Sequence, residues 1–308
     1  VRQSPALVRT RRVLFALAFL CIVCGFLFLV VRPTPTHRTA APLLSETEYE
    51  TYRSTYVDIS KETNPREALA QLRADITENN ALSRRCHVIT HELGRNAFGN
   101  YADFATALSY EDDVCNSGYL HGVIEAYFSA VEDITSAMKQ VCNQYVGSSF
   151  MSWECYHGVG HGLMFYTEND LPQAVHMCRL YNNLTARMSC INGVFMENFN
   201  TDQDIHPSRY IKNDDSFYPC DIQDPFERDV CYLYAPTLYL SRHANDYAGA
   251  LQWCGTSEKE YRAACYEGVG GQAIKENIND PLFVAEQCSS GTESQRWSCI
   301  KGMAGLYV

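Results

Sequence analysis

The longest apolar stretch of the chain is Val13–Val31, nineteen residues without a charged side chain. As a helix it would be about 28 Å long, which is enough to cross the hydrocarbon core of a bilayer. Residues 1–12 contain four arginines, so the positive-inside rule predicts a cytoplasmic N-terminus. The pattern predicts an uncleaved single-pass anchor that meets the lipid bilayer through residues 13–31. A cleaved signal peptide is the alternative.

Apolar spacing changes after this run. Residues 32–45 are rich in proline and threonine and predict a short, stiff linker. Apolar residues then recur at spacings of three and four over 46–60 and again over 65–78, which predicts two amphipathic helices. We expect these helices, within 46–80, to form a cap on the domain formed by residues 81–308.

A short motif, C-x-x-G, recurs through the rest of the chain. Six copies, the fourth of them degenerate, are separated by 40, 35, 41, 34 and 34 residues. They start at Cys115, Cys155, Cys190, Cys231, Cys265 and Cys299. A period of this length indicates a stack of similar supersecondary units.

Helix signals lie within each unit. An Asn-Asp pair precedes an apolar run at Asp170, Asp246 and Asp280, each eight residues before a cysteine, and predicts a helix N-cap. A short helix should therefore end at that cysteine, and a second helix should begin near the next one. The sequence predicts an all-α fold, a solenoid of six or seven helical hairpins behind one N-terminal transmembrane helix.

Cysteine usage supports the hairpins. The chain has fourteen cysteines, of which two lie in the apolar run, and ten of the others form local pairs 11 to 13 residues apart. The pairs are Cys142/Cys155, Cys178/Cys190, Cys220/Cys231, Cys254/Cys265 and Cys288/Cys299. Outside the cytoplasm, this regular spacing predicts one disulfide per hairpin, each worth about 3 kcal/mol in the chain-entropy model. A thiolate zinc site is the weaker alternative, because the spacing is not that of a zinc ribbon.

Two cysteines, Cys86 and Cys115, remain without a local partner. Both align with the second cysteine of a pair, at the starts of adjacent helices. The candidate pairing for them is a bridge between neighbouring units.

In period and hairpin pattern, residues 83–308 resemble the Sel1-like and tetratricopeptide helical-repeat proteins, especially secreted ones with disulfides. The resemblance implies stacked helical hairpins. It does not extend to the tryptophan and tyrosine pattern of tetratricopeptide repeats.

Charge narrows the range of functions. Residues 1–32 hold five arginines and no acid, so the rest of the chain has 20 basic and 36 acidic residues, a net charge of −16. Such an acidic body argues against nucleic acid as a partner. No nucleotide-binding glycine motif follows a strand, and no C-x-x-C-H motif is present for haem attachment.

Five of the nine histidines fall in register. His91, His121 and His161 lie five or six residues after a cysteine in consecutive units, so they should stack in one row. His87 and His157 each precede a member of that row by four residues, on the same helix face. The later copies have Met196, Thr237, Gly271 and Gly305 in this column.

Histidines four residues apart on a helix chelate transition metals, so the row predicts a site for zinc, copper or iron. Glu92, Glu125 and Glu197 lie nearby in the pattern, where they would hydrogen-bond the ligand histidines, supply oxygen ligands or act as a base. The alternative is a packing seam of histidines that are each hydrogen-bonded to separate carbonyls. Three ligands with an open position would favour catalysis, and four would favour a structural or storage role.

Two classes of function follow. The first is a metal-dependent enzyme or a metal carrier outside the cytoplasm. The second is a non-catalytic scaffold that binds a protein or peptide on its concave face, as repeat arrays do.

Overall fold

The structure is a computed structural model, and it describes residues 38–200, 207–214 and 216–307. The chain divides into two compact units, residues 1–39 and 40–308, and the account below concerns the second. The predicted membrane helix at 13–31 lies outside the described residues. None of the described helices combines the length and the apolar character that crossing a bilayer requires.

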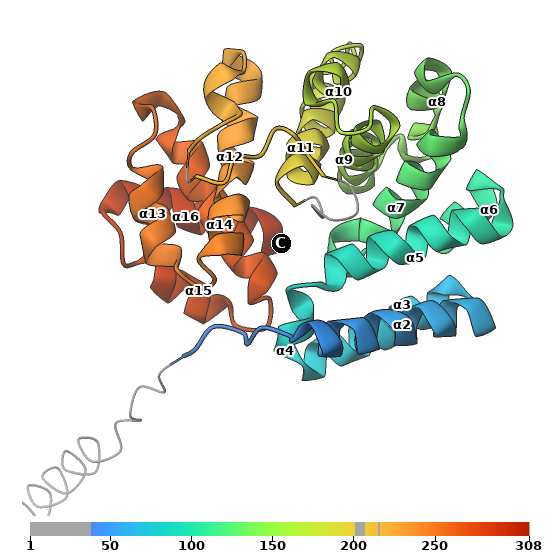
Figure 1. Cartoon of the computed structure of the whole chain (residues 1–308), viewed down its shortest axis with the longest axis horizontal. Coiled ribbons are helices and arrows are strands. Elements are labelled where there is room, and N and C mark those ends of the chain that lie inside the picture. Colours follow the sequence, from blue (N-terminus) through green and yellow to red (C-terminus); the bar gives the residue numbers. More distant parts are fainter. Residues whose placement is uncertain (1–37, 201–206, 215, 308) are drawn as a thin grey trace, which may run out of the picture. The chain divides into compact units, whose positions relative to one another are not determined.

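All regular secondary structure in the described residues is helical, as predicted. Two helices, α2 (Glu46–Glu62) and α3 (Pro65–Glu78), lie where the amphipathic pattern places them. Figure 1 shows the helices that follow. They are α4 (Asn80–Ser83), α5 (Cys86–Tyr101), α6 (Phe104–Leu108), α7 (Val114–Ala130), α8 (Ile134–Gln140), α9 (Ser149–Tyr166), α10 (Leu171–Cys178), α11 (Leu184–Asn200), α12 (Pro225–Arg242), α13 (Tyr247–Cys254), α14 (Arg262–Glu276), α15 (Pro281–Cys288) and α16 (Glu293–Tyr307).

The ends of the short helices confirm the capping signals. The side chains of Asp170, Asp246 and Asp280 accept hydrogen bonds from backbone N–H groups three residues ahead, and α10, α13 and α15 end at a cysteine. The long helices begin earlier than predicted: α11 starts six residues before Cys190. Its first two residues, Leu184 and Thr185, are exposed, so the start of the helix adds little to the buried apolar pattern that the prediction used.

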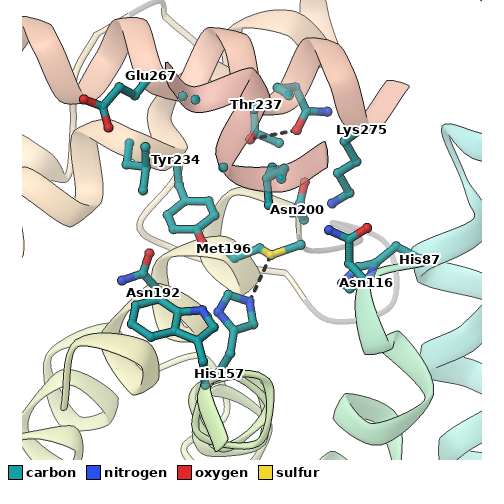
Figure 2. Close-up of a pocket in the computed structure, with 18 of the residues that line it drawn as sticks. His87, Asn116, His157, Asn192, Met196, Asn200, Tyr234, Thr237, Glu267 and Lys275 are labelled. Atoms are coloured by element: carbon teal, nitrogen blue, oxygen red, sulfur yellow. Dashed lines mark hydrogen bonds between the residues drawn. The ribbon is translucent and has the colours of Figure 1, made fainter. Parts of the chain in front are cut away.

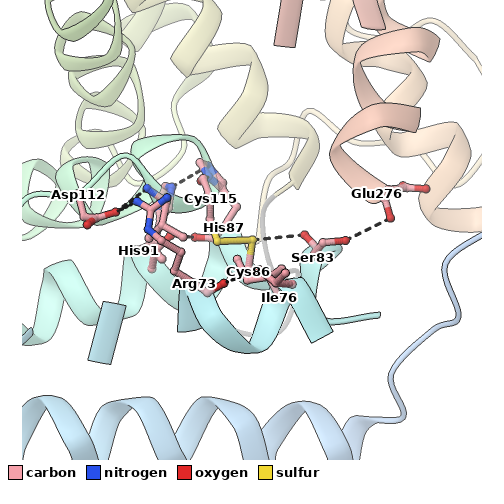
Figure 3. The surroundings of a disulfide bond; sticks show 12 residues. Arg73, Ile76, Ser83, Cys86, His87, His91, Asp112, Cys115 and Glu276 are labelled. Atoms are coloured by element: carbon pink, nitrogen blue, oxygen red, sulfur yellow. Dashed lines mark hydrogen bonds and ion pairs between the residues drawn. A yellow bond between two sulfur atoms is a disulfide. The ribbon is translucent and has the colours of Figure 1, made fainter. Parts of the chain in front are cut away.

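The structure contains the five predicted local disulfides, with Cα–Cα distances of 5.3 to 5.7 Å. Each one staples the two members of a unit together. A sixth disulfide, between Cys86 and Cys115, joins α5 to α7, so the bridge between neighbouring units is also present (Figure 3). Six disulfides indicate an oxidising, extracytoplasmic environment.

The long helices α5, α7, α9, α11, α12, α14 and α16 form one layer, in which each packs on the next. We call them the inner helices. Glycines bring their backbones into contact: a Cβ added at Gly122 would overlap the carbonyl oxygen of His91, and one at Gly94 would overlap that of Tyr119. The same reciprocal contact recurs between α9 and α11 and between α14 and α16.

The row of inner helices curves until the segment before α5 meets the end of α14. Arg84, just before α5, donates to Glu276 at the end of α14 over 2.7 Å, and both side chains are buried. Asn279 donates to the carbonyl of Ile76 over 2.8 Å. An open solenoid would leave these segments apart, so the repeat period predicts the units but not this closure.

We predict that Gly122→Ala destabilises the protein by about 3 kcal/mol, at the upper end of the overpacking range. The added methyl group would overlap a backbone oxygen, which cannot rotate away as a side chain can. Urea unfolding followed by circular dichroism measures the change.

The matched control is Gly99→Ala, because Gly99 lies inside α5 and an added Cβ there would have no neighbour within 4 Å. This variant should be unchanged or more stable by up to about 1 kcal/mol. Equal stability of the two variants would contradict the role given to glycine contacts.

Candidate metal centre

The inner helices bring four of the five predicted histidines together. His87 and His91 come from α5, His121 from α7 and His161 from α9, and one ligand atom of each lies within 4.8 Å of those of the others. All four side chains are buried. The close approach of α5 and α7 at Gly122 accounts for part of this convergence, since that glycine follows His121 directly and touches the backbone of His91.

His87 is held by the turn that opens α7. Its Nδ1 lies 2.6 Å from the carbonyl oxygen of Cys115, which can only accept a hydrogen bond. Cys115, Asn116 and Ser117 adopt left-handed backbone angles, with φ between 53° and 57°, and the disulfide from Cys115 ends next to His87 at Cys86 (Figure 3). The proton of His87 therefore sits on Nδ1, and its Nε2 carries a lone pair.

His91 and His161 are held by carboxylates. Nδ1 of His91 lies 2.6 Å from Oε1 of Glu125, and the other oxygen of Glu125 accepts a bond of 2.6 Å from Arg95. Nδ1 of His161 lies 2.7 Å from Oε2 of Glu197. The carboxylates thus keep both protons on Nδ1, in the carboxylate–histidine arrangement that orients metal ligands.

The result is a set of buried lone pairs that face one another. Nε2 of His87 and Nε2 of His91 are 3.0 Å apart, and Nε2 of His161 has no hydrogen-bond partner. Two lone pairs at this distance repel unless a cation lies between them. Nitrogens bound tetrahedrally at 2.0–2.1 Å from a metal ion are about 3.3 to 3.4 Å apart, which is close to the separation observed.

His121 differs from the other three histidines because neither of its ring nitrogens has a hydrogen-bond partner. Its Nε2 lies 3.5 Å from a carboxylate oxygen of Glu154. A buried imidazole without partners costs free energy, and a metal ion would satisfy it. The seam of separately bonded histidines, the alternative drawn from the sequence, does not describe this cluster, because the second nitrogens converge instead of meeting separate carbonyls.

Two predicted residues lie apart from the four. Nε2 of His157 is 3.1 Å from the sulfur of Met196, although its ring lies 5.0 Å from that of His161. The carboxylate of Glu92 accepts a hydrogen bond of 2.5 Å from Arg53 and belongs to the contact between α2 and α5. Of the three predicted acids, the structure brings Glu125 and Glu197 to the cluster but not Glu92.

Burial controls the charge of the cluster. It lowers the pKa values of His87, His91 and His157 well below the ordinary 6.5, and lowers that of His161 to about 3. Neighbouring histidines and Lys275 act in the same direction, because each positive charge opposes the next. The imidazoles of these four histidines are therefore neutral at pH 7, the state in which imidazole binds metals.

A pocket of about 410 Å³ opens beside the cluster (Figure 2). Its wall includes His87, His121 and His157, and all seven inner helices contribute residues to it. Trp153, Met196, Tyr234 and Leu306 give it aromatic and apolar surface.

Sequence reasoning missed many residues of the pocket, among them Glu154, Tyr234 and Lys275. Glu154 and Lys275 come from helices far apart in the chain, and no motif links them. The only signal in the sequence was the repeat itself, because residues on the inner face of every long helix are candidates for a shared concave surface.

Comparison with known proteins gives no relative: no family model, no curated protein and no solved structure matches the chain. Any statement about function must therefore rest on the residues and their geometry alone.

We predict that the metal-free protein loses stability on acidification. In the unfolded chain, histidine has a pKa near 6.5. In the folded protein, the lowered pKa values keep His87, His91 and His161 unprotonated. The unfolded state thus binds more protons as the pH falls below about 6.5, and each such histidine costs about 1.4 kcal/mol at pH 5.5. Urea unfolding of chelator-treated protein at pH 7.5 and 5.5 measures the sum.

The control for this experiment is His176→Asn, because His176 is exposed on α10 and should leave the pH dependence unchanged. A stability that stays constant between pH 7.5 and 5.5 would show that the cluster is not buried in its neutral form.

Proposed function

We propose that this protein is an extracytoplasmic metalloprotein in which His87, His91, His121 and His161 bind one transition-metal ion. One observation carries the proposal. The Nδ1 atoms of three buried histidines are fixed by a carbonyl or a carboxylate, and two of their Nε2 lone pairs face each other at 3.0 Å. This orientation is costly without a cation and is the usual one for metal-bound imidazole.

Zinc is the ion proposed, and copper and iron are the other metals that imidazole ligands suit. The three anchored histidines would form the firm part of the site. His121 would complete it on the side of the pocket, and since nothing fixes its Nδ1, it is the ligand that water or a substrate displaces most easily.

The neighbouring pocket supports a metal-dependent enzyme. A catalytic zinc ion needs a position that substrate or water can reach, and such an ion brings the pKa of bound water towards 7. Glu154, on the pocket wall and 3.5 Å from His121, would be the carboxylate available as a base beside such an ion. Structural zinc sites, in contrast, are closed by four protein ligands and leave no coordination position for water or substrate.

A metal carrier is the second candidate, because four histidines gather where three would suffice for catalysis. Azide binding to the cobalt-substituted protein separates the two. A catalytic site would bind azide and change the visible spectrum of cobalt, whereas a closed carrier site would not.

Membrane attachment through residues 13–31, with the N-terminus in the cytoplasm, remains part of the proposal on the strength of the sequence pattern. The six disulfides agree with a domain outside the cytoplasm. A scaffold that binds a protein or peptide on the concave face stays the alternative, and it requires no metal.

We predict one zinc ion per chain by elemental analysis of protein reconstituted with zinc and then desalted. His91→Ala should abolish this stoichiometric binding, because it removes one of the three anchored ligands. Glu125→Gln should weaken zinc affinity about 10- to 100-fold, since it removes the carboxylate that orients His91.

Glu92→Gln and His176→Ala are the matched controls, because neither residue lies in the cluster, and both should keep one zinc ion per chain. Full zinc occupancy in His91→Ala would overturn the proposed centre. Lack of zinc, copper and iron in the wild-type protein under the same conditions would favour the scaffold instead.

A further inference from the structure

Lys275 is a cation in the pocket wall with no ion-pair partner among the described residues. It lies on α14, it is half-buried, and its ammonium forms no hydrogen bond or ion pair with any described residue. Burial lowers its pKa to about 8, so it remains mostly protonated at pH 7. Lys301, the other lysine of the pocket, is largely exposed and is bound to Glu267 over 2.7 Å.

The acids near Lys275 all have other partners. Glu276, its neighbour in the chain, accepts from Arg84 and from Tyr247, each over 2.7 Å. Glu154 faces His121, and Glu197 is bound to His161. The charges of Glu276 and Glu197 act on Lys275, but neither carboxylate forms an ion pair with it, so a further anion in the pocket would stabilise this half-buried ammonium.

The surroundings of Lys275 are suited to a polar group. Figure 2 shows Lys275 pointing into the pocket towards the region of Asn116, Asn200 and His87. These amides can hydrogen-bond an anion, and His87 connects this region to the histidine cluster. Trp153 and Tyr234 lie elsewhere on the same wall and offer aromatic surface to the body of a ligand.

From this arrangement we propose that the pocket binds a small organic carboxylate as substrate, with the carboxylate on Lys275 and the reacting group at the metal. A single ammonium matches a carboxylate, which carries one negative charge. The described lining contains no arginine, the residue that recognises phosphate in a bidentate manner. A pocket of about 410 Å³ takes a ligand of drug-like size rather than a folded partner. This inference rests on the proposed metal centre for the reaction, but the binding of the carboxylate depends on Lys275 and not on the metal.

The test compares hippurate with its uncharged amide, hippuramide, by calorimetry on the zinc-loaded full chain. Hippurate should bind at least tenfold more tightly. Lys275→Met should remove this preference, because methionine keeps the length of the side chain without its charge. Lys275→Arg should restore the preference in part, and Lys301→Met should keep it, since Lys301 is already paired.

Zinc content and thermal unfolding of Lys275→Met complete the test. We expect one zinc ion per chain and a melting temperature no lower than that of the wild type, because the substitution removes an unpaired charge. An unchanged preference for hippurate in Lys275→Met would overturn the inference, and so would equal binding of hippurate and hippuramide by the wild type. Tighter binding of the phosphonate analogue of hippurate would overturn the choice of carboxylate.

The zinc-free protein separates this inference from the proposed function. If zinc does not bind but hippurate is still preferred over hippuramide, Lys275 is a carboxylate anchor and the metal centre is wrong. If zinc binds without any such preference, the metal centre stands and the carboxylate assignment fails.

Discussion

Backbone contact between neighbouring inner helices is the constraint on which the site depends. At Gly94 and Gly122, α5 and α7 touch without intervening side chains, and the same occurs where α9 meets α11. Side chains beside such a contact are brought much closer than across an ordinary helix interface of 8–10 Å. Histidines of α5 and α7 can therefore point their ring nitrogens at one small region. Between α7 and α9, Gly158 instead leaves room for the side chain of His121, which lets His161 of α9 join them.

The cluster also explains several polar features that would otherwise be costly. Glu125 is fully buried, yet its two oxygens are used by Arg95 and His91, so its charge is compensated. The left-handed turn at the start of α7 aims the carbonyl of Cys115 at His87, and the Cys86–Cys115 disulfide ties that turn to α5. Two rings fixed with their lone pairs opposed repel each other, a bound cation would relieve this repulsion, and burial disfavours a proton in that role.

Much of this organisation could be predicted from the sequence because it is periodic. The cysteine spacing predicted the local disulfides, and the Asn-Asp pairs predicted the caps of α10, α13 and α15. The register of His91, His121 and His161 predicted that these side chains converge. The site prediction that failed depends on the direction in which a single side chain points. Glu92 follows His91 directly, but successive residues on a helix point about 100° apart, so it faces Arg53 instead of the cluster.

Other features depend on how the units add up. A period of 34 to 41 residues predicts the length of each hairpin but not the small rotation between successive hairpins. This rotation decides whether the row stays open or brings α4 into contact with α14. Closure in turn places residues of α14 and α16 opposite those of α7 and α9. Lys275 and Glu154 thus share a pocket, although no sequence pattern predicts that they lie near each other.

The central claim is that the converging Nε2 atoms hold a metal ion. Crystals of the zinc-loaded protein, measured on both sides of the zinc absorption edge, test it most directly. The account predicts an anomalous peak at the zinc edge, about 2.0 to 2.1 Å from Nε2 of His87, His91 and His161. A peak located only at surface residues, or the four rings in their present positions with an ordered water and no anomalous signal between them, would contradict it.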